Sequence, residues 1–222
     1  MVAVACTQIE KTVKAIQKSM KEINFHEVLL LTHEKINLDH LDIKVVNIEK
    51  LDYKGYNSFI MYRLKDYIKS EFALVVQHDG YILRPQKWDD NFLNYDYIGA
   101  PWGKGLHFAP DGTEVRVGNG GFSLRSQKLL RSLTELGLPY AASDIHSSHE
   151  DIIICDYYRN KLEDYGVKFA PVEVAARFSL ETHCTESDYK SFGFHNSKKP
   201  FHTRLIKKVK SLIKDLKKKK TV

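Results

Sequence analysis

Asp79 is the residue whose type and position most directly suggest chemistry. It stands in the run Gln77-His78-Asp79-Gly80, directly after the uncharged apolar residues 72–76. A carboxylate at the end of a buried strand can hold a divalent cation, Mn²⁺ or Mg²⁺, that takes few protein ligands and bridges a substrate diphosphate. The plainer alternative is that the Asp-Gly pair only forms a turn.

A glycine-rich segment follows further along the chain, Gly118-Asn119-Gly120-Gly121-Phe122-Ser123-Leu124-Arg125-Ser126. Glycines let the backbone approach a ligand closely, so residues 119–121 are candidates for lining a ligand pocket. Ser126 can cap a following helix. No Gly-Lys-Ser/Thr follows the glycines, which excludes a Walker A loop. An ordinary tight loop remains the alternative.

Two more groups of titratable side chains could act with Asp79. His149-Glu150-Asp151 opens an expected helix. Its adjacent acids either stabilise the helix dipole or offer one general base to a sugar hydroxyl. His195 follows an aromatic-glycine stretch in Phe192-Gly193-Phe194-His195-Asn196. This context suits a neutral imidazole presented to a metal, although a lone histidine often has a structural role.

The elements around these residues predict an α/β fold with a mostly parallel sheet flanked by helices. Apolar runs predict strands at 2–6, 28–31, 43–48, 72–76 and 167–170, helical periodicity predicts helices at 9–23, 56–69, 126–136 and from 150, and residues 191–196 are expected to form a loop. Thr7 and Glu10 match a capping box for the first helix. Ligands of such sheets bind beyond the carboxyl ends of the strands, where Thr7 and residues 77–79 are expected.

Composition limits the class of protein. The chain has 222 residues, of which 43% are hydrophobic and 28% charged, as in an ordinary globular protein. No apolar run approaches the roughly 20 residues of a transmembrane helix, and residues 1–6 lack the anatomy of a signal peptide. The three cysteines are widely spaced, which favours a reducing compartment over a disulfide framework. A cytoplasmic location is therefore predicted.

The positive charge is concentrated at the C-terminal end. The net charge is +6, but residues 198–222 carry eleven Lys or Arg and one Asp, which leaves about −4 for residues 1–197. We expect a domain at 1–197 and a basic amphipathic helix at 203–220 that lies on an anionic membrane surface. Docking on its own domain and a frayed, solvated end are the alternatives. The segment lacks the interleaved aromatics of an RNA-binding tail, so no nucleic-acid partner is expected.

The spacing of four motifs resembles one protein family. The motifs are Gln77–Gly80, Tyr95–Trp102, Gly118–Ser126 and His149–Asp151, and the resemblance covers roughly residues 55–195. They are similar to an uncharacterised, mostly microbial family, formally a domain of unknown function, whose members are described as glycosyltransferases. More distantly, the order of motifs resembles Fringe-like inverting transferases with the GT-A fold. A GT-A-like, Rossmann-type α/β fold is the expectation that this resemblance implies.

The resemblance also implies a role for each motif residue. Asp79 and His195 would be metal ligands, and Asp151 would be the general base with Glu150 as the competing choice. Nucleotide-sugar contacts are implied at Thr7, Gln77, His78, Asp79, Asn119, Gly120 and Gly121, and sugar-stacking surfaces at Tyr97 and Trp102. The usual metal motif has two or three acids, and His78 replaces the earlier one. Weak or metal-free diphosphate binding therefore remains an alternative.

The function expected from this resemblance is transfer of a hexose from a nucleotide-sugar, with a UDP-sugar favoured, to a hydroxyl of a glycan or lipid-linked acceptor. Inversion at the anomeric carbon, a role in polysaccharide biosynthesis and peripheral attachment to the inner face of a membrane are further expectations. Two alternatives remain open. One is a nucleotidyltransferase, although residues 7–11 lack its basic, glycine-rich signature. The other is a non-catalytic, membrane-associated sugar-binding module.

Overall fold

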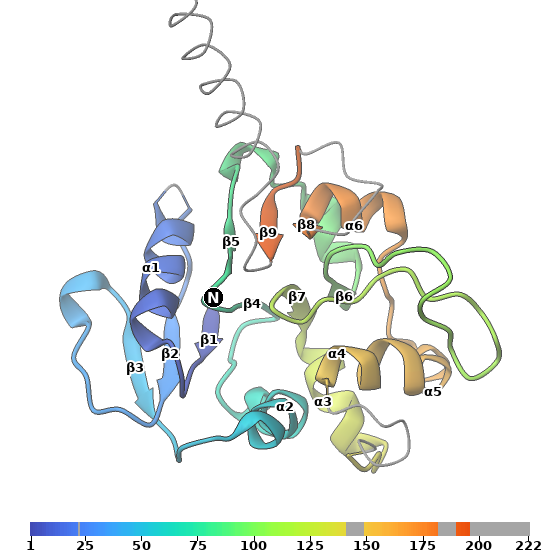
Figure 1. The fold of residues 1–222 in the computed structure, drawn as a ribbon, viewed down its shortest axis with the longest axis horizontal. Helices are drawn as coiled ribbons and strands as arrows, with labels where there is room; N and C mark the ends of the chain where they lie inside the picture. The colour runs from blue at the N-terminus through green and yellow to red at the C-terminus, as the bar shows by residue number, and fades with distance from the viewer. Residues whose placement is uncertain (22, 141–148, 182–189, 196–222) are drawn as a thin grey trace, which may run out of the picture.

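A twisted six-stranded sheet forms the centre of the molecule (Figure 1). The computed structural model describes residues 1–21, 23–140, 149–181 and 190–195. Within these residues the strand order is β3-β2-β1-β4-β7-β6. The strands are β1 (Val2–Val4), β2 (Leu29–Thr32), β3 (Lys44–Asn47), β4 (Phe72–Val76), β6 (Tyr97–Ile98) and β7 (Phe122–Ser126). The predicted α/β class with a mostly parallel sheet is confirmed.

The sequence did not predict β7 or the two-residue β6 of this sheet. β7 runs antiparallel to β4, with Val76 opposite Phe122, and antiparallel to β6. The prediction treated residues 118–126 as a glycine-rich loop, but its second half is a fully buried strand. The antiparallel direction matters because it brings the glycines that precede β7 to the edge where β1 and β4 end.

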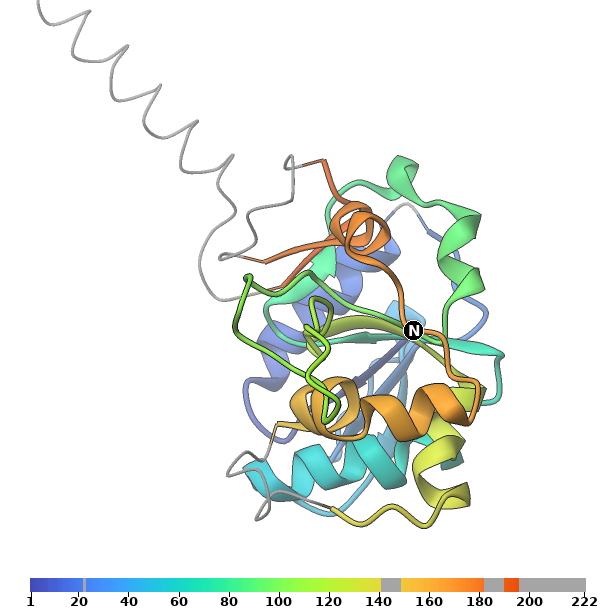
Figure 2. The same ribbon diagram turned by 90° about the vertical axis from the view of Figure 1, so that its right-hand side faces the viewer.

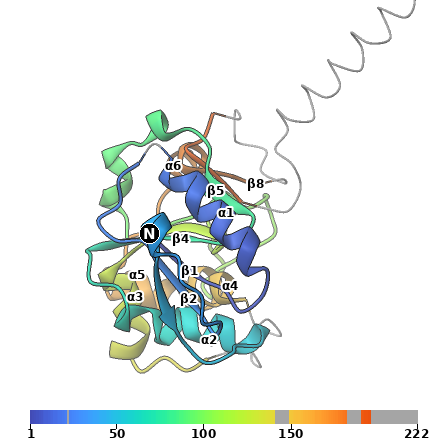
Figure 3. The ribbon, with the colours of Figure 1, turned by 90° about the vertical axis from the view of Figure 1, so that its left-hand side faces the viewer.

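Helices cover both faces of this sheet. α1 (Ile9–Met20) and α6 (Val172–Phe178) lie on one face, and α2 (Tyr53–Tyr62), α3 (Gln127–Glu135), α4 (Glu150–Ile152) and α5 (Arg159–Asp164) lie on the other (Figures 2 and 3). A π-helical turn over Ile153–Tyr157 joins α4 to α5. Short 3₁₀ helices occupy Asp39–Leu41, Leu64–Asp66, Pro85–Lys87 and Asp90–Asn94. The structure is thus a three-layer α/β/α arrangement.

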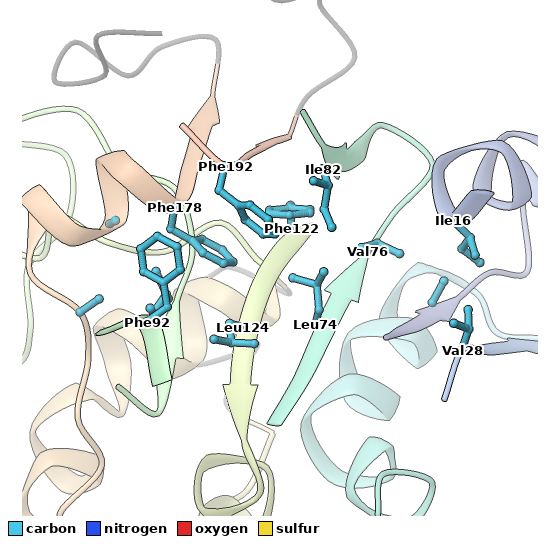
Figure 4. Packing of buried hydrophobic residues seen from close by; sticks show 14 of the residues in the cluster. Ile16, Val28, Leu74, Val76, Ile82, Phe92, Phe122, Leu124, Phe178 and Phe192 are labelled. Carbon is cyan, nitrogen blue, oxygen red and sulfur yellow. The ribbon is translucent and has the colours of Figure 1, made fainter. Parts of the chain in front are cut away.

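Alternating strand residues build a separate core on each face. Leu74, Val76, Phe122 and Leu124 point toward α1 and α6, where they join an aromatic group that includes Phe178 (Figure 4). Ala73 and Val75 of β4 point to the other face, where they share a cluster with residues of α2 and α3. Because both faces are covered, the inner strands β1 and β4 are wholly apolar, as a doubly covered sheet requires, whereas the edge strand β3 has the exposed polar ends Lys44 and Asn47.

A second, three-stranded sheet lies beside the first and was not predicted. Its order is β5-β9-β8, formed by β5 (Gly80–Ile82), β9 (Gly193–His195) and β8 (Ser179–Glu181). The prediction of a loop over residues 191–196 is wrong for 193–195, because these residues pair with β5 and β8. Such short strands have too few residues to show a period in the sequence.

Several local predictions also need correction. Residue Gln8 is the N-cap of α1, it has a left-handed backbone (φ 53°), and it makes no side-chain cap bond, so the Thr7–Glu10 capping box is not formed. Around 167–170, where a strand was expected, the backbone forms only an isolated bridge between Phe169 and Tyr97. By contrast, Ser126 caps α3 as predicted, accepting from the Leu129 amide at 3.1 Å.

The basic segment 203–220 and the boundary near residue 197 lie outside the described residues. Among the helices that the structure does describe, none combines the length and the apolar character that crossing a membrane would require.

Candidate functional site

Three chain segments meet at the edge where β1 and β4 end. Residues 5–8 follow β1, residues 77–79 follow β4, and residues 118–121 precede the antiparallel β7. The Gln77 amide donates to the Gly121 carbonyl at 2.9 Å, which ties the second segment to the third. The edge at which Thr7 and residues 77–79 were predicted to lie therefore also carries the glycine-rich segment.

A cavity of about 310 Å³ opens beside these segments. It is lined by Val4, Ala5, Cys6, Thr7, Thr12, Leu51, Asp52, Tyr53, Tyr56, Gln77 and His78. Three of these, Thr7, Gln77 and His78, were predicted to contact a nucleotide-sugar. The first residues of α2 were not predicted to take part, because the helix was expected to start only at Tyr56.

Tyr56 and Gln77 contribute polar groups to the lining of this cavity. The side-chain Nε2 of Gln77 donates to the Tyr56 hydroxyl at 2.7 Å. Burial, together with the nearby negative charge of Glu150, raises the pKa of the Tyr56 phenol well above its usual value, so the hydroxyl remains protonated. It therefore keeps a hydrogen to donate, and the cavity combines an apolar floor with a few fixed polar groups.

Asp79 and His195, the two predicted metal ligands, lie together although they are far apart in the sequence. His195 Nε2 is 3.7 Å from Asp79 Oδ1. This carboxylate oxygen is buried and has no hydrogen-bond partner within the described part of the chain. A single ion bonded to each atom at roughly 2.1 Å could span that separation, so the two residues fit a divalent cation.

The fit requires further ligands from the substrate. The described residues contain no group of three or more His, Cys, Asp or Glu side chains arranged to hold a metal. A cation here would depend on phosphate oxygens and water to complete its coordination, as Mg²⁺ commonly does. His78 approaches the same carboxylate, with its Nδ1 3.6 Å from Asp79 Oδ1.

The environment of His195 is strongly acidic. Burial alone would lower the pKa of its imidazole, but the contacts with Glu181 and the charge of Asp79 outweigh burial and raise the pKa above its ordinary value. Gly121 packs directly against this ring, because a Cβ at position 121 would lie only 2.0 Å from His195 Nε2. The glycine is therefore required by the imidazole rather than by a left-handed turn.

A buried ion pair lies beneath the glycine-rich segment. Arg125 on β7 donates from Nη2 to Glu150 Oε1 at 2.8 Å, and the two side chains are 1% and 5% exposed. The Arg125 Nε also donates to the Ser123 hydroxyl at 3.0 Å. Burial raises the pKa of the Glu150 carboxyl, and the positive charge of Arg125 opposes that rise. A Cβ on Gly120 would lie 1.8 Å from the same carboxylate oxygen.

Asp151 differs from its neighbour in both exposure and contacts. Its side chain is half-buried, and its Oδ2 accepts from the Gly120 amide at 3.2 Å. Its Oδ1 accepts from the Ile152 amide at 3.0 Å. Asp151 thus faces the glycine-rich segment at the site, whereas Glu150 is held in the interior by Arg125.

Tyr97 and Trp102 do not lie as the sequence analysis expected. Tyr97 is 0% exposed and Trp102 is 8% exposed. One face of the Trp102 ring stacks on His107, with centroids 3.8 Å apart, and Gly118 packs so closely that a Cβ would lie 1.9 Å from the ring. As placed, both rings fill the core and neither offers a face to a sugar.

Asn119 lies in the glycine-rich segment with a left-handed backbone (φ 67°). Its amide nitrogen donates to Glu181 Oε2 at 2.5 Å. Sequence reasoning missed both Glu181 and Arg125. An arginine within the otherwise uncharged residues 122–126 was the available signal for Arg125, while nothing in the sequence near Glu181 indicated a site.

Comparison with known proteins places the chain in a family. A family model described as "Protein of unknown function (DUF5672)" matches residues 37–195. The chain belongs to this family. A search of curated proteins found no match.

Comparison with solved structures identifies the fold of this chain. An active-site mutant of LgtC superposes with a TM-score of 0.51 at 12% identity, covering 89% of this chain and 87% of that chain. The apo form of the glycosyltransferase GlyE from Streptococcus pneumoniae matches with a TM-score of 0.44 at 14% identity, over 78% of this chain and 45% of that chain. The fold is that of the GT-A glycosyltransferases.

Proposed function

We propose that this protein is a glycosyltransferase that moves a hexose from a nucleotide-sugar, preferably a UDP-sugar, to a hydroxyl of a glycan or lipid-linked acceptor. The observation that carries the proposal is the meeting of Asp79, His195, Gly120 and Asp151 beside one cavity at the ligand-binding edge of a GT-A-type sheet. The fold agrees with this activity, and the arrangement of these side chains supplies the chemical argument for it.

The cavity lined by Thr7, Tyr56 and Gln77 is the proposed site of the nucleoside. Its volume of about 310 Å³ is at the lower end for small-molecule pockets, and His78, which lines it, has its Nδ1 3.6 Å from Asp79 Oδ1. A nucleoside seated there would direct its phosphates toward Asp79 and His195. Backbone approach at Gly120 and Gly121 would leave room for the sugar.

Asp79 and His195 would hold Mn²⁺ or Mg²⁺ together with the diphosphate. Such a cation, when bound, neutralises charge on the departing diphosphate. The chain itself contributes a carboxylate oxygen that is buried and lacks a hydrogen-bond partner among the described residues, and an imidazole whose Nε2 faces it. His195 lies on β9 and Asp79 directly precedes β5, with which β9 pairs, so the two groups are held close before substrate arrives, which limits the reorganisation needed on binding.

Asp151 is the proposed general base. Glu150 is ill suited to the role because its carboxylate is buried and paired with Arg125. Asp151 is half-buried at the site, and the amide of Gly120 holds its carboxylate in place. A base in this position would take the proton of the acceptor hydroxyl as that oxygen attacks the anomeric carbon and the bond to the diphosphate breaks, which gives inversion.

The first experiment measures donor binding. Thermal shifts of wild type, Asp79→Ala and the exposed control Asp164→Ala are recorded with nucleoside diphosphates and their sugars, with and without Mn²⁺. A ligand at 100 times its Kd stabilises the fold by about 2.7 kcal/mol, which is measurable. We expect a Mn²⁺-dependent shift with one nucleotide that Asp164→Ala retains and Asp79→Ala loses. If no nucleotide stabilises wild type, the donor site is absent and a sugar-binding module becomes the better hypothesis.

The second experiment tests the role of Asp151 by turnover. Release of nucleoside diphosphate from the preferred donor is followed with water as the default acceptor. Loss of a general base lowers rate by roughly 10²–10⁴-fold, so Asp151→Asn should do this while donor binding is unchanged. If Asp151→Asn turns over at the wild-type rate, the base has been assigned to the wrong residue.

Attachment to a membrane is proposed for residues 203–220, whose composition is that of a basic amphipathic helix. It would place the site near lipid-linked acceptors on a cytoplasmic membrane face. Deletion of residues 203–222 should abolish cosedimentation with anionic vesicles and leave donor binding intact. Unchanged cosedimentation of the deletion variant would refute this part of the proposal.

A further inference from the structure

Glu181 is absent from every motif discussed so far, yet the second sheet places it at the centre of the site. In β9 the partner of His195 on one side is Gly80, which follows Asp79, and the partner on the other side is Glu181 in β8. Register therefore sets Gly80, His195 and Glu181 in one row across three strands, and Asp79 directly precedes Gly80 in the chain. The loops alone would not fix such a row.

The two oxygens of the Glu181 carboxylate reach two different parts of the site. Oε1 is 3.5 Å from His195 Nδ1, and both side chains are 17% exposed. Oε2 accepts from the Asn119 amide at 2.5 Å. The imidazole thus lies between two carboxylates, with Glu181 at Nδ1 and Asp79 at Nε2.

The opposite nitrogens of an imidazole have complementary roles in proteins. A histidine that ligates a metal through one nitrogen commonly directs the other toward a carboxylate, which fixes the ring orientation and the tautomer. Here the nitrogen turned to Glu181 is the one remote from Asp79. The Glu181 contact to Asn119 adds a link to the glycine-rich segment, so one carboxylate restrains both sides of the proposed diphosphate site.

We infer that Glu181 is a positioning residue that orients the His195 imidazole, with Nε2 toward Asp79, and tethers the glycine-rich segment through Asn119, so that the site is ready for a divalent cation and a diphosphate. The inference rests on the proposed function. Glu181 itself need not touch the cation or the substrate, because its two carboxylate oxygens already face Asn119 and His195.

The test measures Mn²⁺ binding rather than turnover. Free Mn²⁺ is titrated by electron paramagnetic resonance in the presence of saturating UDP, with wild type, Glu181→Gln and Glu173→Gln. Glu173 is an exposed residue of the neighbouring α6, so its variant controls for loss of a negative charge in this region. Removing a carboxylate that supports a metal ligand typically weakens metal affinity by roughly 10–100-fold, which is the effect expected for Glu181→Gln alone.

Two further measurements separate positioning from a merely structural role. Metal-free thermal stability and UDP affinity without Mn²⁺ should be unchanged in Glu181→Gln. Long-range ¹H–¹⁵N spectra, with the His195 signals assigned from His195→Gln, should show hydrogen on Nδ1 in wild type and an altered tautomer balance in the variant. If Glu181→Gln is poorly folded, Glu181→Asp retains the charge with a shorter reach and should fall between wild type and Gln in Mn²⁺ affinity.

The outcomes separate this inference from the proposed function. Equal Mn²⁺ affinity in Glu181→Gln and Glu173→Gln would overturn the role of Glu181 and leave the donor site standing. Wild-type protein that binds UDP with no dependence on Mn²⁺ would overturn the inference and the metal part of the proposal together. Wild-type protein that binds no nucleotide would reject the proposed function, and the inference with it.

Discussion

Breaking the buried ion pair between Arg125 and Glu150 should destabilise the protein more than almost any other polar substitution. The pair is 2.8 Å apart, and neither side chain is more than 5% exposed. Replacing Arg125 with Met, or Glu150 with Leu, leaves the other charge in an interior that cannot solvate it. Removal of one partner of a buried pair costs roughly 3–5 kcal/mol.

Replacing both partners should cost far less than the sum of the single changes. The double variant has no isolated charge, and apolar replacement of a whole buried pair is often close to neutral. Some loss remains, because Arg125 also donates to Ser123, and such a bond contributes about 1.5–3 kcal/mol when one partner is charged. We therefore expect the double variant to be more stable than either single variant.

The assay is urea unfolding followed by tryptophan fluorescence and by circular dichroism, with coincident transitions as the test of two-state behaviour. Thermal unfolding of the same variants provides a second measure: in a protein of this size 1 kcal/mol corresponds to about 2–4 °C, so each single variant should lose roughly 6–20 °C in Tm. If the stability losses of the two single variants add up to the loss of the double variant, the two residues are not energetically coupled. The burial argument that excludes Glu150 as a base would then lose its support.

Three other predictions follow from the same geometry. Cys6 lines the cavity, so UDP should protect it from alkylation, whereas Cys155 should stay unlabelled in the native protein because burial raises the pKa of its thiol far above the usual value; peptide mapping checks both. Gly121→Ala should displace His195 and remove the Mn²⁺-dependent part of the nucleotide thermal shift, because its Cβ would lie 2.0 Å from the imidazole. At Gly112 an added Cβ would meet no other atom, and only the positive φ of 85° opposes a side chain. Gly112→Ala should therefore lower the free energy of unfolding by only about 1 kcal/mol and leave nucleotide binding unchanged.

The edge of the sheet that carries the site was predictable because it depends on local patterns. The uncharged run 72–76 forms β4 with the predicted bounds, and the polar residues after it lie at the carboxyl end of that strand. The pairing of Asp79 with His195 came only from a family resemblance, since no local pattern connects two residues so far apart. The structure supplies the reason, which is the pairing of β5 with β9.

Which side chains are buried was much less predictable, because burial depends on residues that are distant in the sequence. Tyr97 and Trp102 are aromatic residues of the kind that stack on sugars, yet both rings are buried by other parts of the chain, which their local sequence does not reveal. The sequence analysis singled out Gly120 and Gly121 for the general reason that glycine permits close approach. The specific reason is that Glu150 and His195 already occupy the space of their Cβ atoms.

The antiparallel direction of β7 explains how so small a set of strands can build this site. In a wholly parallel sheet the segment preceding a strand lies at the opposite edge from the segment following one. Because β7 is reversed against β4, the glycines before Phe122 arrive where β4 delivers Gln77, and the Gly121 carbonyl accepts from the Gln77 amide. The same reversal carries Arg125 to a level of the sheet from which its side chain reaches Glu150. One strand direction thus sets both the open side of the site and the buried charge beneath it, and a sequence-based prediction that missed β7 could find the residues without finding their arrangement.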